Sequence, residues 1–248
     1  MRILMINPNT SVSFTDKVRR IAEGAAAGGT EVVAVNPASG PRSIEGIYDE
    51  LLSSAGVLEL AIAQLDDFDA FVIACYSDHP TIYALREITA KPVLGIAEAS
   101  MLTACMVGHK FSIVTTNCEW EPLLADAVRH YGLAERCASV RSTGMAVLAL
   151  ESAPPEVTDA LIIEAARRAV EQDGADVICL GCAGMAGLDK KVADALGVPV
   201  IDGVVSALKL LEGLVAVGLH TSKRLAYAQP KYKRLENLPE IFERVYQR

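Results

Sequence analysis

Short runs of strand-forming residues alternate along the chain with longer stretches in which apolar residues recur at helical spacing. The first run, residues 2–7, leads through a polar turn to an amphipathic stretch over residues 16–27. Strands that alternate with helices are typical of parallel sheets joined by right-handed crossovers. The pattern predicts further strands at residues 31–35, 70–75, 92–96, 111–116, 138–142, 177–182 and 198–202, and further helices at residues 48–66, 121–131, 158–172 and 204–217.

The second half of the chain repeats the first. Cys182 follows Cys75 by 107 positions, and Pro199 follows Pro92 by the same interval. An ordered set of matches at one offset indicates an internal repeat. The sequence therefore predicts an α/β fold with two similar parallel-sheet, Rossmann-like lobes related by pseudo-twofold symmetry. The same offset pairs Asp69 with Asp176, residues 4–10 with 111–117, and residues 31–35 with 138–142.

The repeat also predicts how the chain is divided and where it acts. We expect residues 1–97 and 206–248 to form one lobe and residues 98–205 the other. Open parallel sheets bind ligands beyond the carboxyl ends of their strands. Two such sheets that face each other would place these ends around one cleft, so the active site is expected between the lobes. The corners that would meet there are residues 8–11, 75–78, 115–117 and 182–184.

Composition and charge narrow the class of protein. The chain is 51% hydrophobic but only 5% aromatic, has no apolar run near the roughly 20 residues that span a bilayer, and lacks a signal-peptide layout at its N-terminus. These features predict a cytoplasmic protein with six reduced cysteines. The net charge of −8 argues against nucleic acid and membrane surfaces as partners. The basic segment from Lys223 to Arg248 is interpreted as a solvated tail or a terminal helix packed on its own protein.

Two thiols at equivalent corners suggest a particular chemistry. Backbone N–H groups at a following helix start stabilise negative charge and lower a cysteine pKa. One thiolate can then remove a proton from carbon while the opposite thiol returns a proton on the other face, which inverts a stereocentre without a cofactor. Cys75 and Cys182 are the candidate catalytic residues. Hydrogen-bonding groups for the anionic intermediate are offered by Asn9, Ser77, Thr115 and Thr116.

The remaining cysteines and histidines suggest other sites less strongly. Cys105, Cys118, Cys137 and Cys179 are interpreted as small buried hydrophobic residues. The CxxC at residues 179–182 begins inside a predicted strand and lacks a second pair, so it predicts neither a redox site nor a zinc site. His79 follows Cys75 closely enough for a Cys–His nucleophile, but it precedes Pro80 and is interpreted as part of the turn or the pocket rim. No metal ligand set and no phosphate-binding loop is evident, so no metal and no cofactor are expected.

Several motifs, taken together, resemble the hydantoin racemase and allantoin racemase family of the aspartate/glutamate racemase superfamily. The resemblance covers nearly the whole chain, up to Lys223. The motifs are INPNTS at residues 6–11, SIEG at 43–46, VIAC at 72–75 with Asp78 soon after, FSIVTT at 111–116, LGCAGM at 180–185 and VPVIDGV at 198–204.

This resemblance implies two lobes, a cleft between them, and racemisation by two cysteines without metal or cofactor. The family's catalytic cysteines fall on Cys75 and Cys182, its turn asparagine on Asn9, and its paired threonines on Thr115 and Thr116. It further implies a small cyclic ureide as the substrate, bound through its carbonyl and N–H groups, and a homo-oligomer. The ring C5–H of such a substrate lies next to a carbonyl, so its anion is delocalised.

The chain departs from the family at the predicted cleft. It reads CYSDHP where members often read Cys-Phe-Gly-Asp-Pro-Gly, and TTNCEW where they often read Thr-Thr-Leu-Pro-Arg. Tyr76, Ser77, His79, Asn117, Glu119 and Trp120 are therefore expected to reshape the pocket. Amino-acid racemases of the superfamily follow the second cysteine with Thr-His. Here Ala183 and Gly184 follow Cys182 and are taken as substrate-binding positions, which argues against glutamate or aspartate as the substrate.

The sequence thus predicts a cofactor-independent isomerase that racemises 5-substituted hydantoins or related cyclic ureides at C5. Allantoin is the leading specific alternative. A second alternative is another isomerase or a decarboxylase of a small carboxylate that uses the same cleft; superfamily decarboxylases usually keep only one of the two cysteines. A third is a two-lobed small-molecule binding protein without catalysis, which would have no need of two thiols at equivalent corners.

Overall fold

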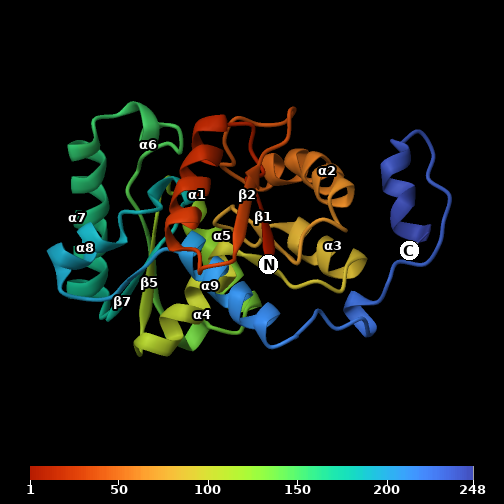
Figure 1. Ribbon diagram of the computed structural model, residues 1–248. Coiled ribbons are helices and arrows are strands. Elements are labelled where there is room, and N and C mark those ends of the chain that lie inside the picture. Colours follow the sequence, from red (N-terminus) through yellow and green to blue (C-terminus); the bar gives the residue numbers. More distant parts are fainter. Residues whose placement is uncertain (248) are drawn as a thin grey trace.

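Two four-stranded parallel sheets form the centre of the molecule (Figure 1). The computed structural model describes residues 1–247, and Arg248, the last of the basic residues in the predicted C-terminal segment, lies outside the described residues. The first sheet has the order β2(Glu31–Val35), β1(Arg2–Ile6), β3(Ala70–Ile73), β4(Val93–Gly95). The second has the order β6(Cys137–Ser142), β5(Phe111–Thr115), β7(Val177–Leu180), β8(Val200–Ile201). The predicted α/β class and all eight predicted strands are confirmed, with the same strand order in both sheets.

The ladder registers refine the repeat. Phe71 pairs with Val93, and Ile178 pairs with Val200, so β3 and β4 correspond to β7 and β8 at the predicted offset of 107. The first strands of the two halves, β1 and β5, correspond at a different offset. Ala70 faces Ile3, whereas Val177, which lies 107 positions after Ala70, faces Phe111. The strand β5 is therefore displaced by one residue from the predicted match, because Phe111 lies 108 positions after Ile3.

Helices cover both sheets and connect the strands. The predicted helices appear with shifted ends as α1(Val12–Ala25), α2(Ile47–Ala63), α5(Trp120–His130), α7(Pro155–Asp173) and α9(Gly203–Ala216). The helix α1 starts four residues before its predicted start, because the side chain of Ser11 accepts a hydrogen bond from the backbone N–H of Phe14. Helices that the sequence pattern missed are α3(Pro80–Ile88), α4(Ile96–Val107), α6(Ala149–Ser152) and α8(Asp189–Leu196), with short 3₁₀ turns η1(Ala134–Arg136), η2(Ala183–Met185), η3(Leu225–Tyr227) and η4(Glu240–Gln247).

The helix α4 was missed for a physical reason. Its residues Ile96, Ala97, Ala99, Ser100, Met101 and Ala104 are all buried. The helix packs against β5, β7 and β8 of the second sheet, against β4 of the first, and against α9. A helix that is covered on most sides has no polar face, and so lacks the amphipathic period on which the prediction depended.

The helix at the end of each half packs on the opposite sheet. The helix α4 follows β4 yet contacts the second sheet, while α9 follows β8 and contacts β3 and β4 of the first sheet. One continuous hydrophobic core therefore includes Met5 and Val72 of the first sheet together with Phe111 and Cys179 of the second. The division into residues 1–97 with 206–248 and residues 98–205 stays a prediction.

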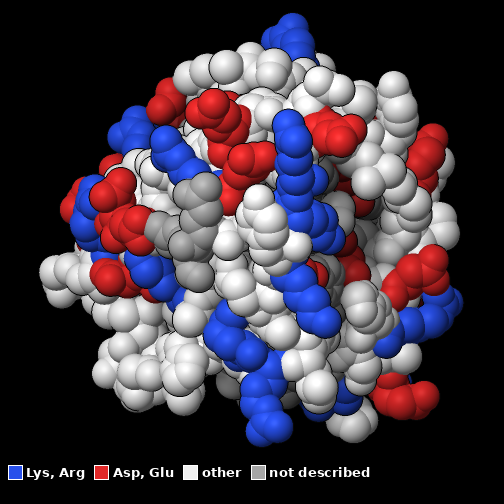
Figure 2. All heavy atoms as spheres, turned by 90° about the vertical axis from the view of Figure 1, so that its right-hand side faces the viewer, with Lys and Arg blue, Asp and Glu red and all other residues white. Residues whose placement is uncertain are grey.

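The basic C-terminal segment lies against its own protein. In Figure 1 it runs past α3 and ends beside α2, where η4 packs and Val245 is buried. Lys223 donates to the carbonyl oxygens of Arg86 at 2.9 Å and Thr89 at 3.4 Å, near the end of α3. Figure 2 views this face and shows its Lys and Arg side chains next to acidic ones. Among the described residues, no helix is long and apolar enough to cross a membrane.

Candidate active site

A pocket opens at the carboxyl ends of the strands of both sheets. The pocket and its mouth hold about 450 Å³ of empty space. Most of this space is shared with the solvent at the mouth, and the enclosed part is small, about 40 Å³. Its walls come from the segments after β1, β3, β5 and β7 and from nearby helices and loops. They are formed by Asn7, Asn9, Phe14, Ile44, Ala74, Cys75, Tyr76, Thr116, Trp120, Val147, Gly181, Cys182, Ala183 and Gly184.

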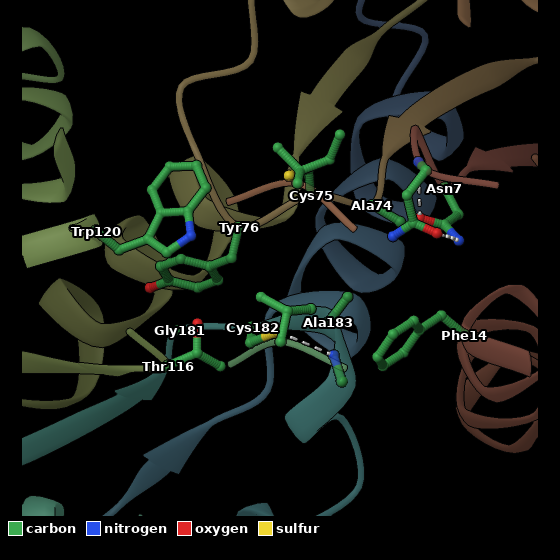
Figure 3. Close-up of a pocket in the computed structure, with 14 residues that line it drawn as sticks. Asn7, Phe14, Ala74, Cys75, Tyr76, Thr116, Trp120, Gly181, Cys182 and Ala183 are labelled. Atoms are coloured by element: carbon green, nitrogen blue, oxygen red, sulfur yellow. Dashed lines mark hydrogen bonds between the residues drawn. The ribbon is translucent and has the colours of Figure 1, made fainter. Parts of the chain in front are cut away.

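The two cysteines of the repeat lie on opposite sides of this pocket (Figure 3). Cys75 follows β3 and Cys182 follows β7, with one residue between strand and cysteine in each case. The backbone N–H of Ala74 donates to the carbonyl of Ile6 at 2.8 Å, and that of Gly181 donates to Val114 at 2.7 Å. These matching bonds hold the two corners at equivalent places. A charge on Cys182 raises the pKa of Cys75, as expected for thiols that face each other across a small space.

Groups around Cys182 favour its thiolate. The backbone N–H of Gly184 donates to the sulfur at 3.4 Å, where Cys182 begins the 3₁₀ turn η2. The ammonium group of Lys17 also lowers the pKa of this thiol. Burial acts in the opposite direction and is the largest effect, so the pKa of Cys182 is raised to about 11.

Lys17 is held beside Cys182 by α1. Its ammonium group donates to the carbonyl of Gly184, the residue whose N–H reaches the sulfur. Burial lowers the pKa of Lys17, while the negative charges of Cys182, Asp202 and Glu151 raise it. Because Phe14 lines the pocket three residues earlier on the same face of α1, this one helix supplies both a wall and a charge.

Cys75 has a different environment. Burial is the largest cause of its raised pKa, and the charge of Glu50 raises it further, whereas the hydroxyl of Ser77 lowers it. The following helix, α3, begins only at Pro80, and in residues 1–247 no backbone N–H donates to the sulfur of Cys75. The prediction that a helix start stabilises each thiolate therefore describes Cys182 and not Cys75.

Two polar groups near Cys75 are buried without partners. Glu50, on α2, is 8% exposed, and its Oε1 has no hydrogen-bond partner among the described residues. The hydroxyl of Ser77, which is 2% exposed, has none either. Burial raises the pKa of the Glu50 carboxyl, the hydroxyl of Ser77 lowers it, and the charge of Asp78 raises it further.

The predicted binding residues divide into two groups. Asn9, Thr116, Ala183 and Gly184 line the pocket with the two cysteines. Ser77 and Thr115 are buried and do not belong to its lining. The hydroxyl of Thr115 donates to the carbonyl of Gly181 at 3.1 Å, so it holds the backbone just before Cys182.

The turn after β1 presents an amide to the pocket. The Oδ1 of Asn9 accepts from Asn7 Nδ2 at 2.9 Å and from the backbone N–H of Ser11 at 2.8 Å. The Nδ2 of Asn9 has no partner within residues 1–247 and is available to donate to a bound carbonyl. Asn7, which the sequence analysis did not single out, orients Asn9 and also donates to Thr15 Oγ1 at 3.0 Å.

Several other functional positions were not predicted. Phe14, Ile44 and Val147 complete the apolar part of the pocket, and Lys17 and Glu50 supply the charges beside the thiols. No local motif marks these positions. Phe14 lies shortly after the INPNTS motif, and Ile44 lies within SIEG. Closeness to a family motif was therefore the signal that could have indicated these two positions.

Two departures from the family pattern do reach the pocket. Tyr76 and Trp120 form one end of it, beside Cys75 (Figure 3). The hydroxyl of Tyr76 is within 2.7 Å of Ser100 Oγ, which orients the ring. Both side chains are almost fully buried, so they narrow the space available to a ligand.

His79 has a structural position. It is fully buried, its Nδ1 accepts from the backbone N–H of Thr81 at 3.3 Å, and its Nε2 lies 3.1 Å from Ser53 Oγ. The ring thereby caps α3, and burial lowers its pKa to about 4. With both nitrogens engaged away from Cys75, it does not form a Cys–His pair.

All six cysteines are free. Of the four interpreted as buried hydrophobic residues, Cys179 is buried in β7, whereas Cys105 and Cys137 are half-buried. The interpretation is wrong for Cys118, which is exposed in the turn before α5.

Comparisons with known proteins agree with this geometry. The model of the Asp/Glu/hydantoin racemase family matches residues 3–211. A hydantoin racemase from Pseudomonas sp. (strain NS671) is 44% identical over 245 residues, which cover 98% of each chain. The crystal structure of allantoin racemase from Pseudomonas fluorescens has a TM-score of 0.92 at 42% identity and covers 96% of this chain and 100% of that one. The structure of an allantoin racemase from Klebsiella pneumoniae has a TM-score of 0.93 at 42% identity, and the match covers 99% of this chain and 98% of that one.

Proposed function

The chain belongs to the Asp/Glu/hydantoin racemase family, and we propose that it racemises 5-substituted hydantoins or related cyclic ureides at C5. The observation that carries the proposal is the pair of thiols, Cys75 and Cys182, on opposite sides of one small pocket. Relatives named as hydantoin and allantoin racemases, at 40–44% identity, support the substrate class.

The proposed reaction moves two protons and needs no other reagent. A thiolate on one side takes the C5 proton, and the electron pair of the broken C–H bond is delocalised onto the adjacent ring carbonyl. The thiol on the other side then gives its proton to C5 from the opposite face. The product is the other enantiomer, and the two cysteines have exchanged their protonation states. Asn9 is assigned to the ring carbonyl, whose oxygen becomes more negative as the C–H bond breaks.

The two environments assign a resting state. Lys17 and the N–H of Gly184 favour negative charge on Cys182, whereas Glu50 and burial favour a neutral Cys75. The free enzyme is therefore proposed to rest with Cys182 as the base and Cys75 as the acid. Because burial raises the pKa of Cys182 to about 11, the rate is expected to rise with pH through the neutral range.

Allantoin is the specific alternative within this class. It is itself a 5-substituted hydantoin, with a ureido group on C5. Allantoin racemases at 42% identity cover nearly all of the chain, and the hydantoin racemase at 44% covers as much. The comparison therefore supports the ring and leaves its substituent to experiment.

The test follows the optical rotation of single enantiomers in D₂O. We would compare allantoin, a 5-alkyl hydantoin and a 5-arylmethyl hydantoin, with the native protein beside Cys75→Ser and Cys182→Ser. The proposal expects rotation to decay to zero with deuterium entering C5, faster than the spontaneous reaction, and both variants to lose this acceleration. No acceleration on any of the three substrates would overturn the assignment to cyclic ureides.

We also propose that the protein acts as a homo-oligomer in the cytoplasm. The apolar side chains of Met106 and Val107, at the end of α4, are each more than half exposed, which supports burial against another subunit. Light scattering after size exclusion would return a multiple of the 26.4 kDa chain mass if this is right. A mass of one chain at micromolar concentration would refute it.

A further inference from the structure

The unpaired groups beside Cys75 need an explanation. Leaving a buried polar atom without a hydrogen bond costs about 1–3 kcal/mol. In residues 1–247 the side-chain oxygens in this condition are Glu50 Oε1 and Ser77 Oγ, and both act on the Cys75 thiol. Both of these atoms lie beside one candidate catalytic group, and the other buried side-chain nitrogen and oxygen atoms of residues 1–247 have partners.

Both groups also line a second pocket, which opens to the surface. Its rim includes Ile47 and Leu51, which are 57% and 62% exposed. Trp120 forms a wall of this second pocket and of the pocket that holds the cysteines. Ser77 and Glu50 thus lie between Cys75, which is half-buried in the wall of the main pocket, and a second place that water enters.

The proposed racemisation requires both sulfurs to exchange protons with water between turnovers. Each turnover of one enantiomer leaves Cys182 protonated and Cys75 as a thiolate. Before the same enantiomer can react again, Cys182 must lose its proton and Cys75 must regain one. Both cysteines line the main pocket, which water refills when the product leaves, and Cys75 also has Ser77 and Glu50 on its own side, at the second pocket.

We propose that Ser77 and Glu50 return the proton to Cys75 between turnovers. The Ser77 hydroxyl gives its proton to the Cys75 thiolate and takes the proton of the Glu50 carboxylic acid. The Glu50 carboxylate then takes a proton from water in the second pocket, and Cys182 releases its proton to water in the main pocket. No bond other than those to hydrogen changes. The proposal rests on the two-thiol function and adds a positioning and proton-carrying role for two residues that do not touch the substrate.

Another acid at the second pocket is already engaged. Asp78 accepts hydrogen bonds from the hydroxyls of Tyr83 at 2.6 Å and Tyr131 at 2.9 Å, and its Oδ2 lies 2.5 Å from His130 Nδ1. These contacts join α3 to the end of α5 and fix Asp78 as part of the structure. Glu50, with a free Oε1 and a carboxyl pKa raised by burial, is the acid that can give a proton.

The test distinguishes proton return from the racemisation step by comparing the rate at saturating substrate, kcat, with the rate at low substrate, kcat/KM. Proton return follows product release, so it limits the rate only when substrate is saturating. Glu50→Gln, which keeps the shape of the side chain but has no acidic proton, is expected to lower kcat about tenfold or more and to lower KM with it. Its kcat/KM is expected to stay within about threefold of the native value. Ser77→Ala is expected to give the same split.

Chemical rescue provides a second readout. Glu50→Ala opens space for a small acid, so formate is expected to restore kcat in proportion to its concentration, with no effect on the native protein. The control is Asp126→Asn, because Asp126 lines the same pocket but pairs with Arg129 on the surface. Equal losses of kcat and kcat/KM in Glu50→Gln, or no loss at all, would overturn the relay while native racemisation upholds the two-thiol function. If the native protein racemises none of the three substrates, both proposals fail together.

Discussion

The corners that hold Cys75 and Cys182 occupy equivalent places in two sheets of the same strand order, yet opposite charges surround them. At Cys182 an ammonium group and a backbone N–H favour the thiolate, and at Cys75 a buried carboxyl opposes it. The proposed two-base racemisation needs sulfurs on both faces of the substrate, and the two sheets place Cys75 and Cys182 on opposite sides of the pocket. It also needs one base and one acid at any moment. The difference between the two thiols comes from the helices: Lys17 on α1 acts on Cys182 and Glu50 on α2 acts on Cys75, and these two residues are not equivalent in the repeat.

The backbones of the two corners differ as well. The residue before Cys75 is Ala74, whereas the residue before Cys182 is Gly181. A methyl group at Gly181 would lie 2.7 Å from the carbonyl oxygen of Val114 and 2.8 Å from Ile113 Cγ2. The second corner is thus packed against its neighbouring strand too closely for a side chain, while the first accommodates one.

The largest effect is expected from removing either sulfur. General acid–base groups contribute about 10²–10⁴-fold, so Cys75→Ala and Cys182→Ala should each lose racemisation by about this factor. Each variant keeps one base and should still exchange the C5 proton of one enantiomer for deuterium without inverting it. NMR after chiral separation would show opposite enantiomers exchanged in the two variants. Exchange of the same enantiomer in both would mean that the sulfurs do not face opposite sides of C5.

A smaller effect is expected at Lys17. The positive charge lowers the pKa of Cys182, so Lys17→Met should raise that pKa above its value of about 11. Below its pKa, a thiol loses tenfold in thiolate for each unit by which the pKa rises. We expect kcat/KM near pH 7 to fall about tenfold and the alkaline rise of the pH profile to move to higher pH.

Two further variants control this prediction. Lys17→Arg keeps the charge and should retain most of the activity. Lys191→Met, on α8, removes a lysine that pairs with Asp159 and should change nothing. The alkylation rate of Cys182 against pH, measured in the Cys75→Ala background, reports the thiol directly. Identical pH profiles for Lys17→Met and the native protein would show that Lys17 does not lower the pKa of Cys182.

The same contrast explains what could be predicted from the sequence. Both cysteines follow buried strands, and strand periodicity and the repeat depend on neighbours along the chain, so their positions were predictable. Lys17 and Glu50 act through the packing of a helix against a distant corner, which no local pattern records. The one-residue displacement of β5 was likewise hidden, because it appears only when Phe111 pairs with Val177 in the sheet.

At the backbone of the second corner, a destabilisation of moderate size is expected. Gly181→Ala would force its methyl group against Val114 and Ile113, and overpacking of this kind costs about 1–3 kcal/mol. Urea unfolding should report this loss as a lower midpoint with an unchanged slope. Racemisation should fall as well, because the strand end that carries Cys182 must move. An unchanged midpoint would show that the strand relaxes at no cost.

The smallest effect is expected from the reverse exchange in the first corner. Ala74 is 2% exposed, so Ala74→Gly removes one buried methyl group and loosens the backbone, each worth about 0.5–1 kcal/mol. The loss should be smaller than that of Gly181→Ala in the same urea titration, because deleting an atom leaves a small gap, whereas adding one meets a carbonyl oxygen at 2.7 Å. If Ala74→Gly lowers stability as much as Gly181→Ala or more, the first corner is at least as sensitive as the second to the change of one methyl group. The difference between them would then lie in their charges alone, and Lys17 and Glu50 would account for all of it.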